Sequence, residues 1–277
     1  FRVMEPPFGV QTWRPPAGHP LEPCIQYVFR VRGAPPYRHE SVLPKGNVDL
    51  LFNLGETVVG TGLTTDPYVA RQGDAWVGGL KTRPYSVHSP AFMDLFGVSL
   101  RAEACAGLIP LSPGEILNLE AHDLPSSAGL GSIGEQLHDT PAFADQCALL
   151  MRWLTARLRP PRGAELVRHA CGLLRQSRAE DAVRATARHL AVSERHLRRL
   201  LDRHLGIGPA EYVRLSRFIS TLHRMTSPHR TLTEIALAAG YYDHAHFSRD
   251  FRSFSGMTPQ EYRAHGSGPS VGHIVLE

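Results

Sequence analysis

The sequence predicts an α+β protein with an N-terminal β-barrel or β-sandwich, helices that trail it, and a C-terminal all-α domain with two helix-turn-helix units. Three observations support this fold class. Short β-branched runs broken by Gly and Pro fill residues 24–101, helical periodicity begins after residue 101, and one pattern occurs twice near the C-terminus. Because strands and helices are segregated along the chain, an α+β arrangement is favoured over alternating α/β units.

Six segments of the N-terminal region have strand character. They are short, rich in β-branched or aromatic residues and bounded by turn-forming residues, at positions 24–31, 48–54, 57–61, 75–80, 85–89 and 94–100. Such spacing is typical of an antiparallel barrel or sandwich. The sequence does not decide between the two.

Aromatic residues in this region are candidates for binding a small molecule. They are Tyr27, Phe29, Tyr37, Trp76 and Tyr85. A sheet that closes on itself can enclose a ligand lined by such rings, and an apolar or aromatic effector would suit them. The alternative is that the rings fill the core or lie at the surface, because an aromatic content of 8% is ordinary.

Helical patterns follow the strands at 101–108, 134–139 and 141–158. One apolar stripe runs along the third helix, through Phe143, Cys147, Leu150, Met151, Leu154 and Leu158. Either it packs on the helix's own barrel, or it forms the seam of a homodimer. The prolines and glycine of 159–163 cannot continue a helix, so we place a linker there, between an effector-sensing or dimerisation domain at 1–158 and a second domain at 164–277.

The second domain contains an internal repeat, with copies at 183–212 and 232–262. At an offset of 50 the matched pairs are Leu197 with Phe247, Arg199 with Arg249, Leu201 with Phe251, Gly206 with Gly256, Pro209 with Pro259 and Tyr212 with Tyr262. Upstream the offset is 49, and it pairs Ala187 with Ala236 and Ala191 with Gly240. The second copy therefore has one extra residue near Asp243.

Each copy has the pattern of a helix-turn-helix. A short helix with a small residue at its packing point leads through a turn to a helix that Ser193 or Asp243 caps. This second helix has an apolar stripe and a polar face, as a helix lying in a DNA groove requires. The candidate DNA contacts are Arg195, Arg198, Arg199, His244, His246, Ser248 and Arg249. One copy alone could equally be an ordinary amphipathic pair, but repetition favours two DNA-reading units.

The second copy, IALAAGYYDHAHFSRDFRSFSGMTPQEYR, resembles the signature of the AraC/XylS transcriptional regulators, and the resemblance extends over 164–264. It implies seven helices, of which a central one at 209–225, about 25 Å long, spaces two recognition helices along DNA. Three departures are Ala191 in place of a turn glycine, the pair Tyr241-Tyr242, and Thr221 in the central helix. Ala191 matters most if its backbone needs a positive φ.

The N-terminal region is more distantly similar to the sensor half of an AraC subgroup, through VLPKGNVDLLFNLG at 42–55 and the segment 96–116. The resemblance implies a sequence-specific regulator, usually an activator, that binds operator DNA and RNA polymerase. Its N-terminal domain would sense a small-molecule effector or mediate homodimerisation. The alternative is a DNA-repair or modifying enzyme that carries the same DNA-binding module.

Charge divides the chain in the same way. Residues 160–277 hold 17 arginines, no lysine and 11 acidic residues, a net charge of +6, whereas residues 1–159 have a net charge of −2. A basic domain is attracted to the phosphate backbone through release of counterions. GC-rich codon usage would explain arginine in place of lysine, but not the asymmetry of sign.

Other functions find little support. The four cysteines lack CxxC spacing, so we expect reduced thiols and neither a zinc site nor the activated cysteine of a repair enzyme. His244 and His246 are two apart and diverge on a helix, and the glycines of 129–134 do not follow a strand. We expect no enzyme activity, catalytic residue, cofactor or metal. No apolar run is long enough to span a membrane, and we expect a cytoplasmic protein.

Overall fold

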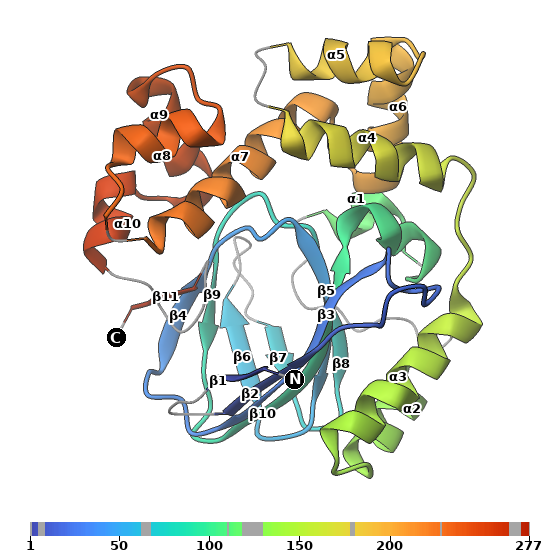
Figure 1. Cartoon of the computed structure of the whole chain (residues 1–277). Helices are drawn as coiled ribbons and strands as arrows, with labels where there is room; N and C mark the ends of the chain where they lie inside the picture. Colours follow the sequence, from blue (N-terminus) through green and yellow to red (C-terminus); the bar gives the residue numbers. More distant parts are fainter. Residues whose placement is uncertain are drawn as a thin grey trace.

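The protein is α+β, as the sequence predicts, with a layer of helices above two antiparallel sheets (Figure 1). The computed structural model describes residues 2–4, 9–61, 68–109, 111–117, 130–177, 181–227, 229–265 and 273–276. We call the two sheets together the barrel and residues 164–265 the helical domain.

One sheet has six strands in the order β1 (Arg2–Met4), β2 (Gly9–Trp13), β3 (Ile25–Gly33), β10 (Met93–Arg101), β5 (Asn47–Asn53) and β8 (Ala75–Gly78). The other has five in the order β11 (His273–Val275), β4 (His39–Val42), β9 (Tyr85–His88), β6 (Val58–Thr61) and β7 (Tyr68–Ala70). Each of the six expected strand segments contains a strand.

The centre of the larger sheet is the best buried part of the barrel. Strand β10 pairs with β3 on one side and β5 on the other, and places Phe96 directly opposite Phe52. Both phenylalanines are almost completely buried, with ring centroids 6.2 Å apart. The strands therefore form around a packed apolar layer.

Short helices follow the barrel strands: η1 (Ala102–Gly107), α1 (Pro113–Ile116), α2 (Leu130–His138) and α3 (Phe143–Arg157). The apolar stripe predicted on α3 packs into the chain's own core. Phe143, Cys147, Leu150, Met151 and Leu154 are buried, and Leu158 is half-buried. This burial answers the choice that the sequence left open for the stripe, because its side chains are already covered.

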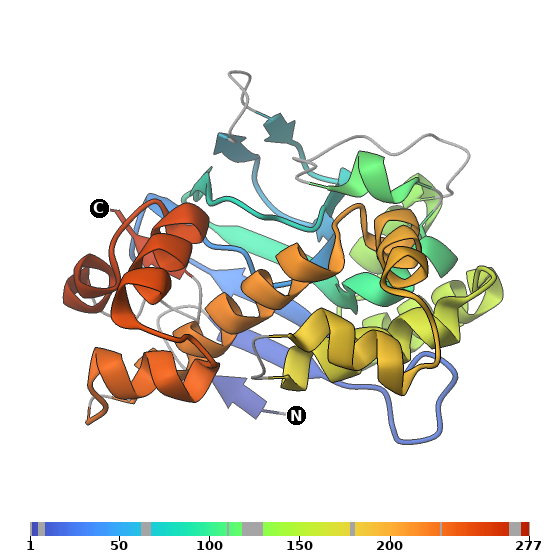
Figure 2. The same ribbon diagram turned by 90° about the horizontal axis from the view of Figure 1, so that it is seen from above.

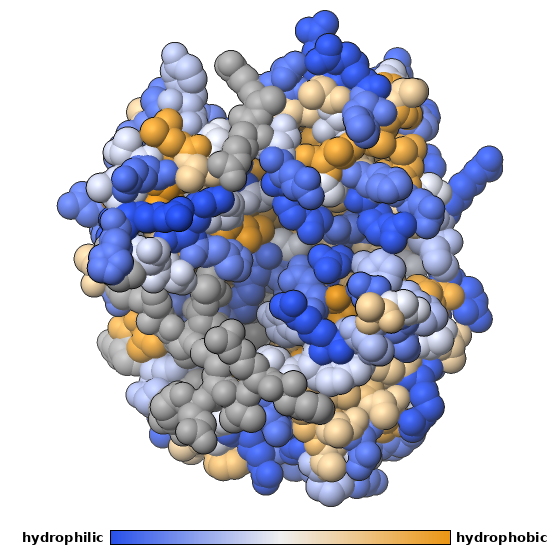
Figure 3. Space-filling view, in the orientation of Figure 1, coloured by the Kyte–Doolittle hydropathy of each residue, from blue (hydrophilic) through white to orange (hydrophobic). Residues whose placement is uncertain are grey.

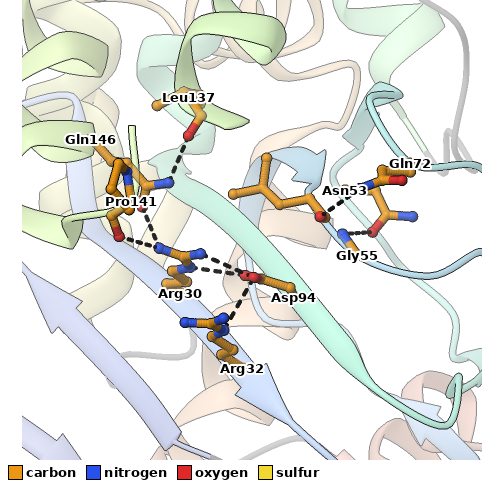
Figure 4. A network of polar contacts seen from close by, with 10 residues as sticks. Arg30, Arg32, Asn53, Gly55, Gln72, Asp94, Leu137, Pro141 and Gln146 are labelled. Carbon is orange, nitrogen blue, oxygen red and sulfur yellow. Dashed lines mark hydrogen bonds and ion pairs between the residues drawn. The ribbon is translucent and has the colours of Figure 1, made fainter. Parts of the chain in front are cut away.

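A buried polar network fastens α2 and α3 to the barrel (Figure 4). The guanidinium of Arg30 on β3 donates to both carboxylate oxygens of Asp94 on β10, at 2.8 and 2.9 Å, and to the carbonyl of Pro141 at 2.9 Å. Arg30 also donates to Gln146, whose amide donates to the carbonyl of Leu137 at 2.8 Å. A buried guanidinium needs such partners because its donors have lost water.

The helical domain contains α4 (Ala164–Gln176), α5 (Ala182–His189), α6 (Glu194–Leu205), α7 (Pro209–Met225), α8 (Leu232–Ala239), α9 (His244–Ser255) and α10 (Pro259–His265). These seven helices of the described range are the number that the family resemblance implies, and α7 has the expected bounds. The views in Figures 1 and 2 agree that α7 runs between α5–α6 at one end and α8–α10 at the other.

The two parts of the molecule are joined at two places. Arg175 of α4 donates to the carboxylate of Glu103 in η1 at 2.6 Å and to the Tyr212 hydroxyl at 2.9 Å. Strand β11 follows the helical domain in sequence but pairs with β4 of the barrel. The expected range 164–277 thus includes a strand of the neighbouring sheet.

Candidate DNA-binding surface and barrel cavity

The first helix-turn-helix unit consists of α5 and α6. Its turn has the Schellman pattern, in which the Val192 amide donates to the Ala187 carbonyl at 3.0 Å and the Ala191 amide to that of Arg188 at 3.1 Å. Ala191 has φ 53° and is the only described residue other than glycine with a positive φ. Ser193 then caps α6 by accepting from the His196 amide at 3.1 Å.

The second unit, α8 and α9, repeats this geometry. The Tyr241 amide donates to the Ala236 carbonyl at 3.0 Å, which is the Val192–Ala187 bond shifted by 49 residues. Gly240 takes the left-handed conformation at φ 87°, and Asp243 caps α9 through the His246 amide at 2.6 Å. The caps are 50 residues apart, so the extra residue lies between turn and cap, as the sequence predicts.

Both recognition helices are anchored by their apolar stripes. Leu197, Leu201, Phe247 and Phe251 are completely buried, as expected, and the small residues Ala187 and Ala236 are buried beside them. In the second unit, Phe251 lies edge-on to Phe218 of α7, with centroids 5.2 Å apart. The buried stripe fixes which face of each helix is turned outward.

The predicted DNA contacts lie on those outward faces. Arg195, Arg198, Arg199, His244 and Arg249 are exposed, and His246 and Ser248 are half-buried. Hydrophilic side chains also cover much of the helical domain on the face drawn in Figure 3. Local contacts orient two of the candidates, since Arg199 lies 3.0 Å from the His196 ring nitrogen and Ser248 lies 3.3 Å from that of His244.

Asp250 supports the second recognition helix, and sequence reasoning missed it. Its carboxylate is buried, 2.9 Å from the Arg214 guanidinium of α7, and 3.6 Å from Nε2 of His246. Burial and this carboxylate raise the pKa of the adjoining Tyr241 hydroxyl. The i, i+4 spacing of His246 and Asp250 was the available signal, but Leu200 stands at the matching position of the first copy and gave no hint.

The five aromatic candidates of the barrel line a single cavity of about 320 Å³, together with aliphatic side chains. Trp76 and Tyr37 are buried, while Tyr27, Phe29 and Tyr85 are half-buried. Burial, reinforced by the nearby Asp49 carboxylate, raises the pKa of Tyr27 to about 12. The phenol therefore stays protonated and available as a hydrogen-bond donor at neutral pH.

One end of the cavity is polar, which sequence reasoning did not predict. Glu40, Lys45, Asp49 and His273 lie there. Nδ1 of His273 is 2.7 Å from a carboxylate oxygen of Glu40, and Nε2 is 2.6 Å from Nζ of Lys45. No local pattern could have shown this end, because Glu40 and His273 are 233 residues apart.

Electrostatics favour one protonation pattern at this end. Burial opposes ionisation of Glu40, but His273 and Lys45 outweigh it and lower the pKa of the carboxyl. Burial and the Lys45 ammonium lower the pKa of His273, while Glu40 partly offsets them. Burial raises the pKa of Asp49, against the opposing charge of Lys45. A neutral His273 thus donates to Glu40 and accepts from Lys45.

Neither metal ligands nor membrane-spanning helices are found in the described ranges. No group of three or more His, Cys, Asp or Glu side chains there could hold a metal ion. Cys24, Cys105, Cys147 and Cys171 are unpaired thiols, and burial raises the pKa of each, most strongly for Cys105. None of the helices in those ranges is both long and apolar enough to cross a membrane.

Comparison with known proteins assigns the two regions separately. Residues 186–265 match a family model described as a helix-turn-helix domain, and residues 13–122 match one described as a domain of unknown function (DUF6597). The transcriptional activator RhaS of Escherichia fergusonii is 35% identical over 79 residues, which is 28% of each chain. RhaS of Salmonella schwarzengrund is 30% identical over 132 residues, covering 45% of this chain and 48% of its own.

The chain spans less than half the length of these curated relatives. Over the whole fold, it is similar to ToxT from Vibrio cholerae, with a TM-score of 0.50 and 11% identity, covering 92% of this chain and 98% of that one. At this identity the likeness shows the fold alone. The matched helix-turn-helix model, the similarity to RhaS and the duplicated motif identify the C-terminal domain of this chain as a member of the AraC/XylS family.

Proposed function

We propose that the protein is a sequence-specific DNA-binding transcription regulator. The observation that carries the proposal is the pair of recognition helices at opposite ends of α7, each anchored by a buried stripe and each with an exposed polar face. At about 1.5 Å per residue, α7 is long enough to help bridge successive major grooves. The relatives named RhaS are transcriptional activators, which supports activation as the outcome.

The two units would read two half-sites. Arg195, Arg198 and Arg199 are proposed to contact one half-site, and His244, His246, Ser248 and Arg249 the other. Arginine recognises guanine through two acceptors in the major groove. The remaining arginines of the helical domain would contact phosphates, which position the protein without reading sequence.

The barrel cavity is proposed to bind the effector. Its size and aromatic lining suit an apolar or aromatic small molecule, whose polar group would lie at the end formed by Glu40, Lys45, Asp49 and His273. The other proposed partners are RNA polymerase and a second copy of the chain. As a regulator of DNA, the protein would act in the cytoplasm without catalysis, cofactor or metal.

Selection of bound duplexes from a random DNA pool tests the central claim with the purified full chain. We expect an enriched motif of two half-sites about 10 base pairs apart. Arg199→Ala should relax one half-site and Arg249→Ala the other. A pool that stays random after repeated selection would show that the protein does not read sequence.

A further inference from the structure

The chain returns to the barrel after the helical domain. In strand β11, His273 pairs with Val42 of β4 and Val275 pairs with Glu40. The Leu276 amide extends this ladder by donating to the His39 carbonyl at 3.0 Å, and Ile274 is only 1% exposed. The strand is thus fastened by backbone hydrogen bonds and by one buried aliphatic side chain.

The same strand supplies one of the four polar residues of the cavity. The His273 ring lies between the Glu40 carboxylate and the Lys45 ammonium, and it uses both nitrogens. Without β11, these two buried charged groups would lose their shared partner, and the wall of the cavity at this end would be missing. A cavity in the N-terminal sheets is therefore completed by the C-terminal end of the chain.

We propose that strand β11 is a component of the barrel's ligand site and couples occupancy of that site to the second helix-turn-helix unit. Only residues 266–272 separate β11 from the end of α10. Seven residues span about 25 Å at most. Tyr262 of α10 packs against Phe251 of the recognition helix, with centroids 5.5 Å apart. The tether therefore connects the cavity wall to the second DNA-reading helix through a short path.

A ligand couples to the strand because it has different affinities for the docked and undocked arrangements. The docked arrangement offers the polar group of a ligand the Lys45–His273–Glu40 chain and a closed wall, so a ligand should stabilise docked β11. By linkage, docking strengthens ligand binding by the same factor. The effector's role rests on the proposed function, whereas the docking and the tether do not.

Hydrogen exchange of the full chain tests the tether without ligand or DNA. Ile274→Asp should undock β11, and Glu40→Gln should loosen it by removing the charged partner of His273 while keeping the side chain's shape. In both variants we expect amide exchange to accelerate severalfold in β11 and in α10. The first unit, α5 and α6, is the internal control and should be unchanged. Leu276→Ala, at a half-exposed side chain, is the matched control.

Accessibility of Trp76 tests the cavity wall. In a background of Trp13→Phe and Trp153→Phe, only Trp76 fluoresces, and acrylamide serves as the probe. Ile274→Asp and His273→Ala should each increase quenching of Trp76, while Leu276→Ala should not. Far-UV circular dichroism identifies any variant that has lost its fold, and Glu40→Gln then decides the question.

The results separate this proposal from the proposed function. Unchanged exchange in α10 when β11 exchanges freely would overturn the coupling, and unchanged Trp76 quenching would overturn the role of β11 in the cavity. Neither measurement contains DNA. Either failure would leave sequence selection by the recognition helices intact, and a failed selection would leave these results standing.

Discussion

In the first helix-turn-helix unit the recognition helix packs through leucines, whereas in the second it packs through phenylalanines that reach the central helix. Phe218 of α7 has both Phe251 and Phe254 within 5.2 Å, centroid to centroid, and Phe251 also meets Phe247 and Tyr262. The two units share a backbone outline, since their turn bonds and caps superimpose in sequence. The repeat therefore preserves geometry, while the side chains that stabilise it have diverged.

The local devices also differ between the units. Helix α8 begins with a capping box, in which Thr231 accepts from the Glu234 amide and Glu234 accepts from the Thr231 amide. Helix α5 begins at Asp181, whose side chain makes no cap bond. The second turn has a glycine where the first holds Ala191 at a positive φ. We infer that the first unit is locally the less stable of the two.

Removing an aromatic side chain from the second unit should have the largest effect. Phe251→Ala leaves a cavity beneath the recognition helix and should cost about 3 to 5 kcal/mol of unfolding free energy. Leu201→Ala, its match in the first unit, should cost about 2 to 5 kcal/mol. Denaturant unfolding measures both, with Phe92→Ala, at a half-exposed ring, as control. An unchanged midpoint for Phe251→Ala would contradict the packing role of the cluster.

Substituting one base-reading arginine should have a smaller effect, on DNA rather than on folding. Arg199→Ala should reduce discrimination between the selected site and random DNA by about 1 to 3 kcal/mol. Arg249→Ala should do the same at the other half-site. Competition binding at fixed salt measures both. Equal weakening on specific and random duplexes would make Arg199 a phosphate contact instead.

Sequence reasoning succeeded where the signal is local or repeated. The 49-to-50 change of offset predicted the extra residue before Asp243, and Pro209 with its helical spacing predicted the bounds of α7. The alternation of β-branched residues located six strands. It could not locate β4, β7 or β11, because strands of three or four residues carry too little periodicity.

The cavity shows where local reasoning stops. Aromatic content selected five of the side chains that line it, but their convergence depends on how two sheets face each other. The polar end was beyond reach, because His273 comes from a strand that pairs across most of the chain length. Asp250 was missed for another reason: it departs from the repeat, and its partner Arg214 lies on a different helix.

Disrupting the capping box should weaken the second unit by about 1 kcal/mol. Thr231→Ala removes the acceptor of the Glu234 amide, whereas Asp181→Ala in the first unit removes no cap bond and should stay within about 0.5 kcal/mol. The bonds to Thr231 lower the pKa of Glu234. Its contribution is therefore present above the ordinary carboxyl pKa and is lost as pH falls through the lowered value. Equal effects of both substitutions would contradict the difference in capping.

Relieving the first turn should give the smallest change, and it should be a gain. Ala191 adopts φ 53°, where its Cβ approaches the following carbonyl. Glycine avoids that contact but loses more entropy on folding, so Ala191→Gly should stabilise the protein by about 0.5 to 1 kcal/mol. Gly240→Ala, at φ 87° in the second turn, is the matched reverse change and should destabilise it. Denaturant midpoints measure both, and a loss of stability in Ala191→Gly would show that the alanine methyl makes a packing contact that outweighs its backbone strain.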